Sequence, residues 1–172
     1  MGNNWKITDT LTKVFAEEVP DGQGSIRLST LHRETVSCVI AYFGAADWGR
    51  YWKVSVKAPE KIETRLRRVE LVPSAYPCHK EQDDNYLRIV PGMYPDLLRD
   101  LDTEDDGADK KYLTKEVPGQ WRSLWLDVTV DAELAGGDYA IVIETETEDG
   151  EKETLKADLH VVDASLPPQK LL

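Results

Sequence analysis

An acidic stretch in the middle of the chain has the spacing of a calcium loop. Asp102, Glu104 and Asp106, followed by Gly107, match the first, third, fifth and sixth positions of an EF-hand loop. The twelfth position, which needs a bidentate glutamate, is occupied by Leu113, and no helical pattern flanks the stretch. We therefore interpret it as a solvated acidic loop, with a calcium site at Asp102, Glu104 and Asp106 as the less favoured alternative.

The histidines and cysteines match no catalytic or zinc motif. His32, His79 and His160 are far apart, and the neighbours Cys78 and His79 would point to opposite faces of an extended chain. There is no nucleophile elbow and no phosphate-binding loop. Because Cys38 and Cys78 alone do not make a disulfide framework, we expect two reduced thiols. We assign no catalytic residue and no cofactor to this chain.

Tryptophan side chains offer a different chemistry, stacking on sugar rings. Trp121 and Trp125 fall on the same side of one expected strand, opposite its aliphatic row, which places both on the less apolar face. They could form the platform of a carbohydrate-binding module. Alternatively, a loop or a neighbouring domain covers them, as is common for tryptophan in β-sandwiches. We favour the second interpretation because exposed apolar patches usually mark a partner surface.

Short strands are the elements that must position these residues. Apolar and polar residues alternate with a period of two in five segments, residues 34–43, 50–58, 66–73, 121–130 and 137–162. In the last segment, Asp149-Gly150 predicts the two-residue turn of a hairpin. Many short strands without helical crossovers predict an all-β fold, an antiparallel β-sandwich of the immunoglobulin or jelly-roll type.

Length and charge limit the possible functions. The 172 residues suffice for one domain with a sizeable core. The net charge of −11 and the scattered basic residues argue against binding to nucleic acid or to an anionic membrane. Because no apolar run is long enough to span a membrane and no export signal is recognisable, we expect a cytoplasmic location.

One segment differs from the alternating strands around it. It reads YLRIVPGMYPDLLRDL from Tyr86 to Leu101, and its prolines and glycine fix a tight path between two apolar patches. Pro95 suits the first turn of a helix, and Asp96 suits the helix N-terminus. The segment therefore predicts one or two short helical turns within the all-β fold.

The order of several motifs resembles the amino-terminal domain of glycoside hydrolase family 123-like proteins. The motifs span most of the chain and read RETVSCVIAYFG, RRVELVPS, YLRIVPGMYPDLL, GQWRSLWLDVTVDAELAGGDYAIVI and LPPQKLL. The most specific is VPGMYPDLL, which is close to the family pattern Pro-Gly-Leu-Tyr-Pro-Asp-Leu-Leu with Met93 in place of the first leucine.

The resemblance implies a role as well as a fold. In such proteins a β-sandwich precedes a (β/α) barrel, and the family removes β-linked N-acetylgalactosamine by substrate-assisted catalysis. The catalytic Asp-Glu pair belongs to the barrel, and no position of this sequence matches it. The resemblance therefore implies a non-catalytic accessory domain, residues 1–163, and the start of a linker to that barrel, residues 164–172. A stand-alone immunoglobulin-like interaction domain is the remaining alternative.

The unusual segment supplies the candidate contact with that barrel. Met93 and Tyr94 would form an amphipathic knob on the path that Pro95 fixes, and Asp96 would cap the following turn. We expect Met93, Tyr94, Pro95 and Asp96 to lie at the domain interface. The alternative is a loop that packs only on its own sandwich.

Overall fold

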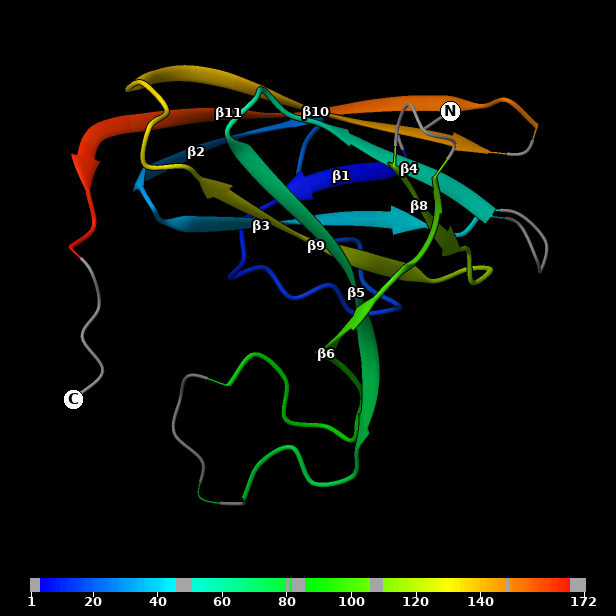
Figure 1. Cartoon of the computed structure of the whole chain (residues 1–172). Helices are drawn as coiled ribbons and strands as arrows, with labels where there is room; N and C mark the ends of the chain where they lie inside the picture. The colour runs from blue at the N-terminus through cyan, green and yellow to red at the C-terminus, as the bar shows by residue number, and fades with distance from the viewer. Residues whose placement is uncertain are drawn as a thin grey trace.

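The computed structural model describes residues 4–45, 51–79, 81, 86–105, 110–147 and 149–167. In these described residues, eleven strands form two β-sheets that pack face to face (Figure 1). The strands are β1 (Trp5–Thr8), β2 (Ser25–His32), β3 (Thr35–Phe43), β4 (Tyr51–Lys57), β5 (Ile62–Ser74), β6 (Gly92–Asp100), β7 (Asp102–Asp105), β8 (Lys110–Lys115), β9 (Trp121–Val130), β10 (Gly137–Thr147) and β11 (Lys152–Ser165).

The sheets differ in size and in one pairing. Sheet A has five strands in the order β1-β3-β9-β5-β6, and sheet B has six in the order β2-β11-β10-β4-β8-β7. The expectation of an all-β sandwich is confirmed. One strand pairing departs from the antiparallel pattern, because β2 runs parallel to β11. Antiparallel β10 is the neighbour of β11 on its other side, so sheet B is mixed.

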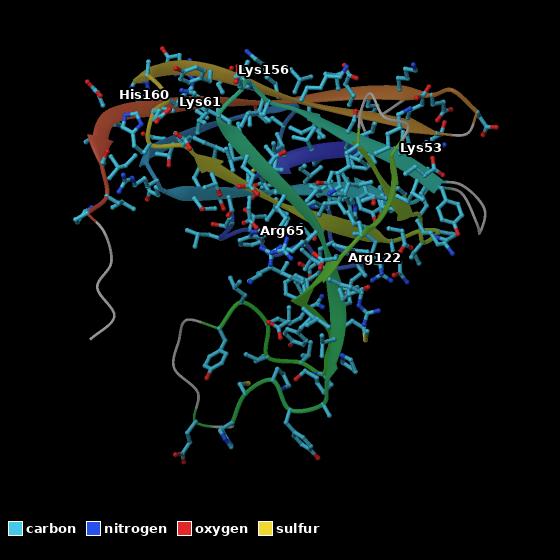
Figure 2. All side chains as sticks on the ribbon, viewed as in Figure 1. Lys53, Lys61, Arg65, Arg122, Lys156 and His160 are labelled. Atoms are coloured by element: carbon cyan, nitrogen blue, oxygen red, sulfur yellow. The ribbon has the colours of Figure 1, made fainter. Side chains whose placement is uncertain are left out.

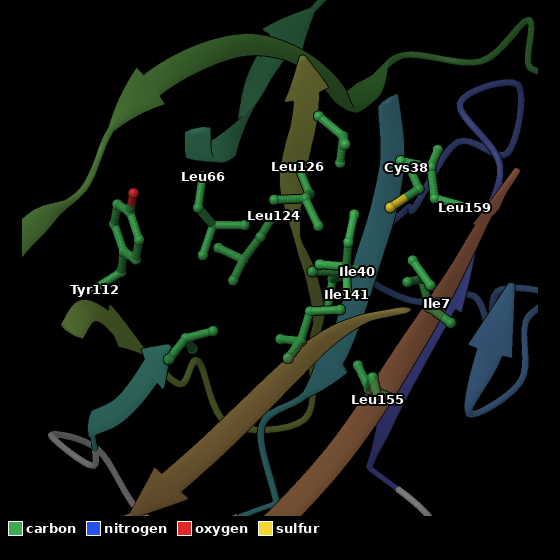
Figure 3. Packing of buried hydrophobic residues seen from close by; sticks show 14 of the residues in the cluster. Ile7, Cys38, Ile40, Leu66, Tyr112, Leu124, Leu126, Ile141, Leu155 and Leu159 are labelled. Atoms are coloured by element: carbon green, nitrogen blue, oxygen red, sulfur yellow. The ribbon is translucent and has the colours of Figure 1, made fainter. Parts of the chain in front are cut away.

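The core lies between the two inner faces, as the alternation of the sequence predicts (Figure 3). From sheet A, Leu124 and Leu126 of β9 are fully buried, and from sheet B so are Ile141, Ile143 and Leu155. Each such side chain stabilises the fold by about 1.5–3 kcal/mol relative to an exposed position. The core is continuous across the sandwich, and it holds both sheets in fixed positions.

Two aromatic side chains of the core, Trp52 and Tyr42, have polar groups with buried hydrogen-bond partners. The indole of Trp52 donates a hydrogen bond to the buried carboxylate of Glu116, and the hydroxyls of Tyr42 and Thr114 lie 2.7 Å apart. Trp5 stacks on Tyr42 with ring centroids 4.9 Å apart. Buried polar groups with such partners avoid most of the cost of desolvation.

The short helix expected near Pro95 is wrong, and the segment is strand β6. It pairs antiparallel with β5 as the edge strand of sheet A, where a proline without an N–H is tolerated. A bulge leaves Asp96 as the extra residue, because Leu97 faces Glu70 and Pro95 faces Leu71. The described residues contain no helix, and thus none that could cross a membrane.

Two glycines stand where a side chain would be unfavourable, one in a turn and one at a close approach of two backbone segments. Gly150 has a φ of 81° in the β10–β11 connection, where its N–H binds the carbonyl of Thr147 at 3.0 Å. The hairpin is confirmed, but its turn is longer than two residues, because Thr147 N–H binds the carbonyl of Glu151. Gly44 lies so close to Val117 that an added Cβ would be 2.2 Å from the Val117 carbonyl oxygen.

Candidate functional site

A hairpin arm at one edge of sheet A carries most of the exposed apolar side chains. The arm comprises the end of β5, the start of β6 and the connection between them, and it projects below the sandwich in Figure 1. Of the ten large hydrophobic side chains that are exposed in the described chain, six lie on it, namely Tyr76, Tyr86, Leu87, Ile89, Val90 and Met93, and a seventh, Leu97, lies further along β6. We call these seven residues the arm patch.

On the outer face of sheet B, several charged side chains form ion pairs. Lys53 pairs with Glu104, Lys57 with Glu144, Lys152 with Glu146, and Lys156 with Asp158. Figure 2 shows Lys53, Lys156 and His160 along this side of the molecule. A solvated face of paired charges has little free energy to gain from a partner. The arm patch is therefore the better candidate for a contact surface.

The four interface candidates from the sequence lie on β6 but face different surroundings. Met93 is 42% exposed and Asp96 is exposed, so both are available at the surface. Tyr94 is half-buried, its hydroxyl donates to the carbonyl of Val90 at 2.6 Å, and Pro95 is buried. Met93 and Asp96 could contact another domain directly, whereas Tyr94 and Pro95 shape the base of the arm.

An electrostatic clasp ties the arm to residues 9–20, which we call the cover segment. The Arg88 guanidinium binds the carboxylates of both Glu17 and Glu18, and it lies 4.1 Å from the centroid of the Phe15 ring. The hydrogen bond from Arg88 lowers the pKa of Glu17. Phe15 also meets the ring of Tyr94 edge-on at 5.7 Å. These contacts fix the direction in which the arm leaves the sandwich.

The cover segment lies over the outer face of sheet A, and it buries one of the two candidate tryptophans. Trp121 is only 7% exposed, packs with Val14 and Ala41, and its backbone N–H binds the carbonyl of Ala16 at 2.8 Å. The segment folds back because the Asp9 carboxylate accepts two backbone hydrogen bonds from the residues that follow it. Trp121 therefore has no free ring face for a sugar.

Trp125 lies at the border of the cover segment, where a half-buried carboxylate binds its indole N–H. The indole N–H donates to Asp127 at 2.7 Å, and the Ser37 hydroxyl donates to the same carboxylate at 2.7 Å. Arg67 pairs with the other oxygen of Asp127 at 2.5 Å. Sequence reasoning missed Asp127. The available signal was its position two residues after Trp125, which puts both side chains on one face.

A groove runs between the cover segment and β6. Its inner hollow has a volume of about 210 Å³ with Trp125, Val39 and Val69 among its lining residues. Its outer hollow has a volume of about 560 Å³ and is lined by Phe15, Tyr94 and Tyr86, among others. Both hollows are also lined by Lys13, Pro95 and Asp96, so the groove is continuous past these three residues.

The candidate calcium ligands and the two cysteines do not belong to this groove. Asp102 and Glu104 lie on β7, where Glu104 pairs with Lys53 at 2.8 Å, and Asp106 lies outside the described residues. In the described part of the chain, no three His, Cys, Asp or Glu side chains gather as metal ligands. Cys38 and Cys78 are free thiols, and burial, with a smaller contribution from the charge of Asp127, raises the pKa of Cys38 to about 12.

Comparison with known proteins supports the fold and little more. No protein-family model and no curated protein matches the chain. Among solved structures, the fold is similar to a family 123 glycoside hydrolase from Clostridium perfringens, with a TM-score of 0.65 and 10% identity. That match covers 95% of this chain but only 28% of the other. The N-terminal domain of PorA has a TM-score of 0.45 at 7% identity, covering 94% of this chain and 99% of that one. A collagen-binding subdomain of the Enterococcus faecalis surface protein ACE has a TM-score of 0.45 at 6% identity, covering 79% and 93% of the two chains.

Proposed function

We propose that this chain is a non-catalytic β-sandwich domain of a larger glycoside hydrolase, and that its arm packs against a catalytic domain of the same polypeptide. The arm patch is the observation that carries this proposal. Leu87 is 75% exposed and Tyr76 is 92% exposed, and further exposed apolar side chains belong to the same hairpin. Such a concentration of apolar surface is unfavourable in water unless a partner covers it.

Two further observations support a domain contact within one polypeptide. The fold is similar to a family 123 glycoside hydrolase that this chain covers over only 28% of its length, so that protein has room for a second domain. The sequence motif VPGMYPDLL, which carries the resemblance to this family, lies on the arm itself. A rigid arm suits this role because the clasp of Arg88 with Glu17 and Glu18 restricts its motion before contact.

The test is a paired substitution in the longer protein and in the 172-residue chain. Leu87→Ser with Met93→Ser removes two exposed side chains of the arm patch, and Leu11→Ser removes an equally exposed leucine on the cover segment. In the 172-residue chain both variants should unfold within about 0.5 kcal/mol of the unchanged protein, because the side chains are exposed. In the longer protein only the arm variant should lower the melting temperature and the hydrolysis of a β-linked N-acetylgalactosaminide.

Calorimetry gives the clearest readout. If the arm packs on the catalytic domain, the two domains should unfold together in the unchanged protein and in two steps in the arm variant. Equal melting behaviour and equal activity of the arm variant and the Leu11→Ser control would contradict the domain contact. A reading frame that encodes no catalytic domain would contradict the role within a hydrolase.

A further inference from the structure

We propose that the groove between the cover segment and β6 is a binding site for a neutral pyranose sugar, with Trp125 as its stacking platform. The two hollows together have a volume within the range of about 300–1,000 Å³ that is typical of small-molecule sites. The groove lies at the base of the arm, at the edge of the surface proposed for domain contact. Ligand sites occur preferentially at such domain borders.

The platform is rigid before any ligand binds. Trp125 is partly buried against the second core cluster, and its indole N–H is already bound to Asp127. Asp127 is held in turn by Ser37 and Arg67, so the ring cannot turn without breaking a carboxylate network. A ring that is fixed in advance loses little conformational entropy when a sugar stacks on it.

Two charged side chains of the groove have no described partner. The Lys13 ammonium and the Asp96 carboxylate line both hollows, and within the described part of the chain neither forms a hydrogen bond or an ion pair. Asp96 is exposed there because the bulge in β6 makes it the extra residue. An ammonium group is a donor and a carboxylate is an acceptor, so together they suit the hydroxyls of a sugar.

The same groups disfavour other ligands. A phosphate or a carboxylate would be attracted by Lys13 but repelled by Asp96, and an apolar ligand would leave both charges desolvated without partners. An extended peptide that adds to the free edge of β6 would meet Pro95, which has no N–H, and the bulge at Asp96. A neutral ligand with one apolar face and several hydroxyls satisfies both the aromatic ring and the two charges.

This inference deepens the proposed function, because a sugar site would let the accessory domain hold glycan beside a catalytic domain. It rests on that proposal only for the choice of sugars to test. All the described lining residues of the groove belong to this chain, so binding can be measured in the 172-residue protein. Domain contact, in contrast, needs the longer protein, and the two can therefore fail separately.

The experiment is an NMR titration with three methyl β-pyranosides, those of galactose, glucose and N-acetylgalactosamine. Each is added to about 50 mM, so that a dissociation constant in the millimolar range, about −4 kcal/mol, would be detected. We expect saturable shifts of the Trp125 indole resonance and of the backbone amides of Lys13 and Asp96. Asp96→Asn should weaken binding at least fivefold. The matched control is Asp138→Asn, which neutralises a carboxylate that is 88% exposed on sheet B and should leave the affinity unchanged.

Several outcomes would overturn the inference. One is the absence of any saturable shift at Trp125 with all three sugars while the spectrum stays that of the folded protein. Another is saturable binding whose shifts map to sheet B. If Asp96→Asn and Asp138→Asn weaken sugar binding equally, the groove is not the binding site. Shifts of the groove resonances that depend on protein concentration rather than on sugar would point to a second copy of the chain instead.

Discussion

The carboxylate of Asp127 should be one of the most sensitive polar positions of this domain. It accepts hydrogen bonds from Ser37 and Trp125 and pairs with Arg67, yet its side chain is only 17% exposed. Replacing it by alanine leaves three donors without their acceptor, and one of them is a guanidinium whose Nε already lacks a described partner. The cost of such a change comes mainly from the groups left behind.

The magnitude follows from these contacts. Hydrogen bonds to a charged group contribute roughly 1.5–3 kcal/mol each, but water can reach Arg67 and Asp127 in part, so the three together should be worth less than their sum. We expect Asp127→Ala to lower the free energy of unfolding by roughly 2–4 kcal/mol. Asp127→Asn keeps an acceptor for Ser37 and Trp125 and should cost about half as much.

The assay is urea unfolding followed by far-ultraviolet circular dichroism, because Trp125 fluorescence would change for local reasons. The slope against urea should stay constant, so that a shift in midpoint reports stability alone. The double variant Asp127→Ala with Arg67→Met should cost less than the sum of the two single changes by about 1–2 kcal/mol. An Asp127→Ala variant within about 0.5 kcal/mol of the unchanged protein, or strict additivity, would refute this account of the network.

Three further predictions concern the clasp, a close backbone approach and the thiols. Arg88→Met should loosen the arm, seen as loss of the NMR contact between Phe15 and Tyr94, whereas Arg99→Met should not. Arg88 lowers the pKa of Glu17, so the pairing of these two side chains should hold the arm fully above pH 4.5, the ordinary pKa of glutamate. This stabilisation should be lost as the pH falls below 4.5. A contact between Phe15 and Tyr94 that is unchanged in acid would count against the clasp. Gly44→Ala should lower the free energy of unfolding, measured in urea, by roughly 2–4 kcal/mol, because the added Cβ would lie 2.2 Å from the Val117 carbonyl oxygen. Gly24→Ala is the control and should be near neutral, because an added Cβ there meets no atom. Equal costs of the two substitutions would contradict this explanation. A disulfide reagent at about pH 8 should label Cys78 quickly and Cys38 only after unfolding, because burial raises the pKa of Cys38 to about 12. Fast labelling of two thiols in the native protein would contradict the burial of Cys38.

The strands could be predicted because a sandwich imposes the same period on every strand. Leu124, Leu126 and Val128 alternate with Trp125 and Asp127 in the sequence, and the structure places the first three in the core. The alternation of apolar and polar residues does not indicate which strands pair with each other. The parallel pairing of β2 with β11 joins segments that lie more than a hundred residues apart, so no local signal announces it.

The errors at the site arose where a local signal competes with a distant one. Pro95 and Asp96 are good residues for the start of a helix, but β5 offers a complete row of backbone partners and an edge position that tolerates proline. Sequence parity correctly put Trp121 and Trp125 on one face. It could not distinguish them, because the segment that buries Trp121 comes from residues more than a hundred positions earlier.

The two sides of the sandwich differ in their exposed apolar side chains, although both sheets carry ion pairs. Sheet B pairs several lysines with carboxylates on the same strand or on nearby strands. On sheet A the bulge of β6 turns Asp96 outward, the cover segment brings Lys13 beside the same groove, and the arm leaves Leu87 and Met93 exposed. A chain under selection for folding alone would not gain from either feature, since an unpaired charge and an exposed leucine contribute little to stability. We therefore look for the function of this domain on the side of sheet A, where a sugar and a second domain would meet.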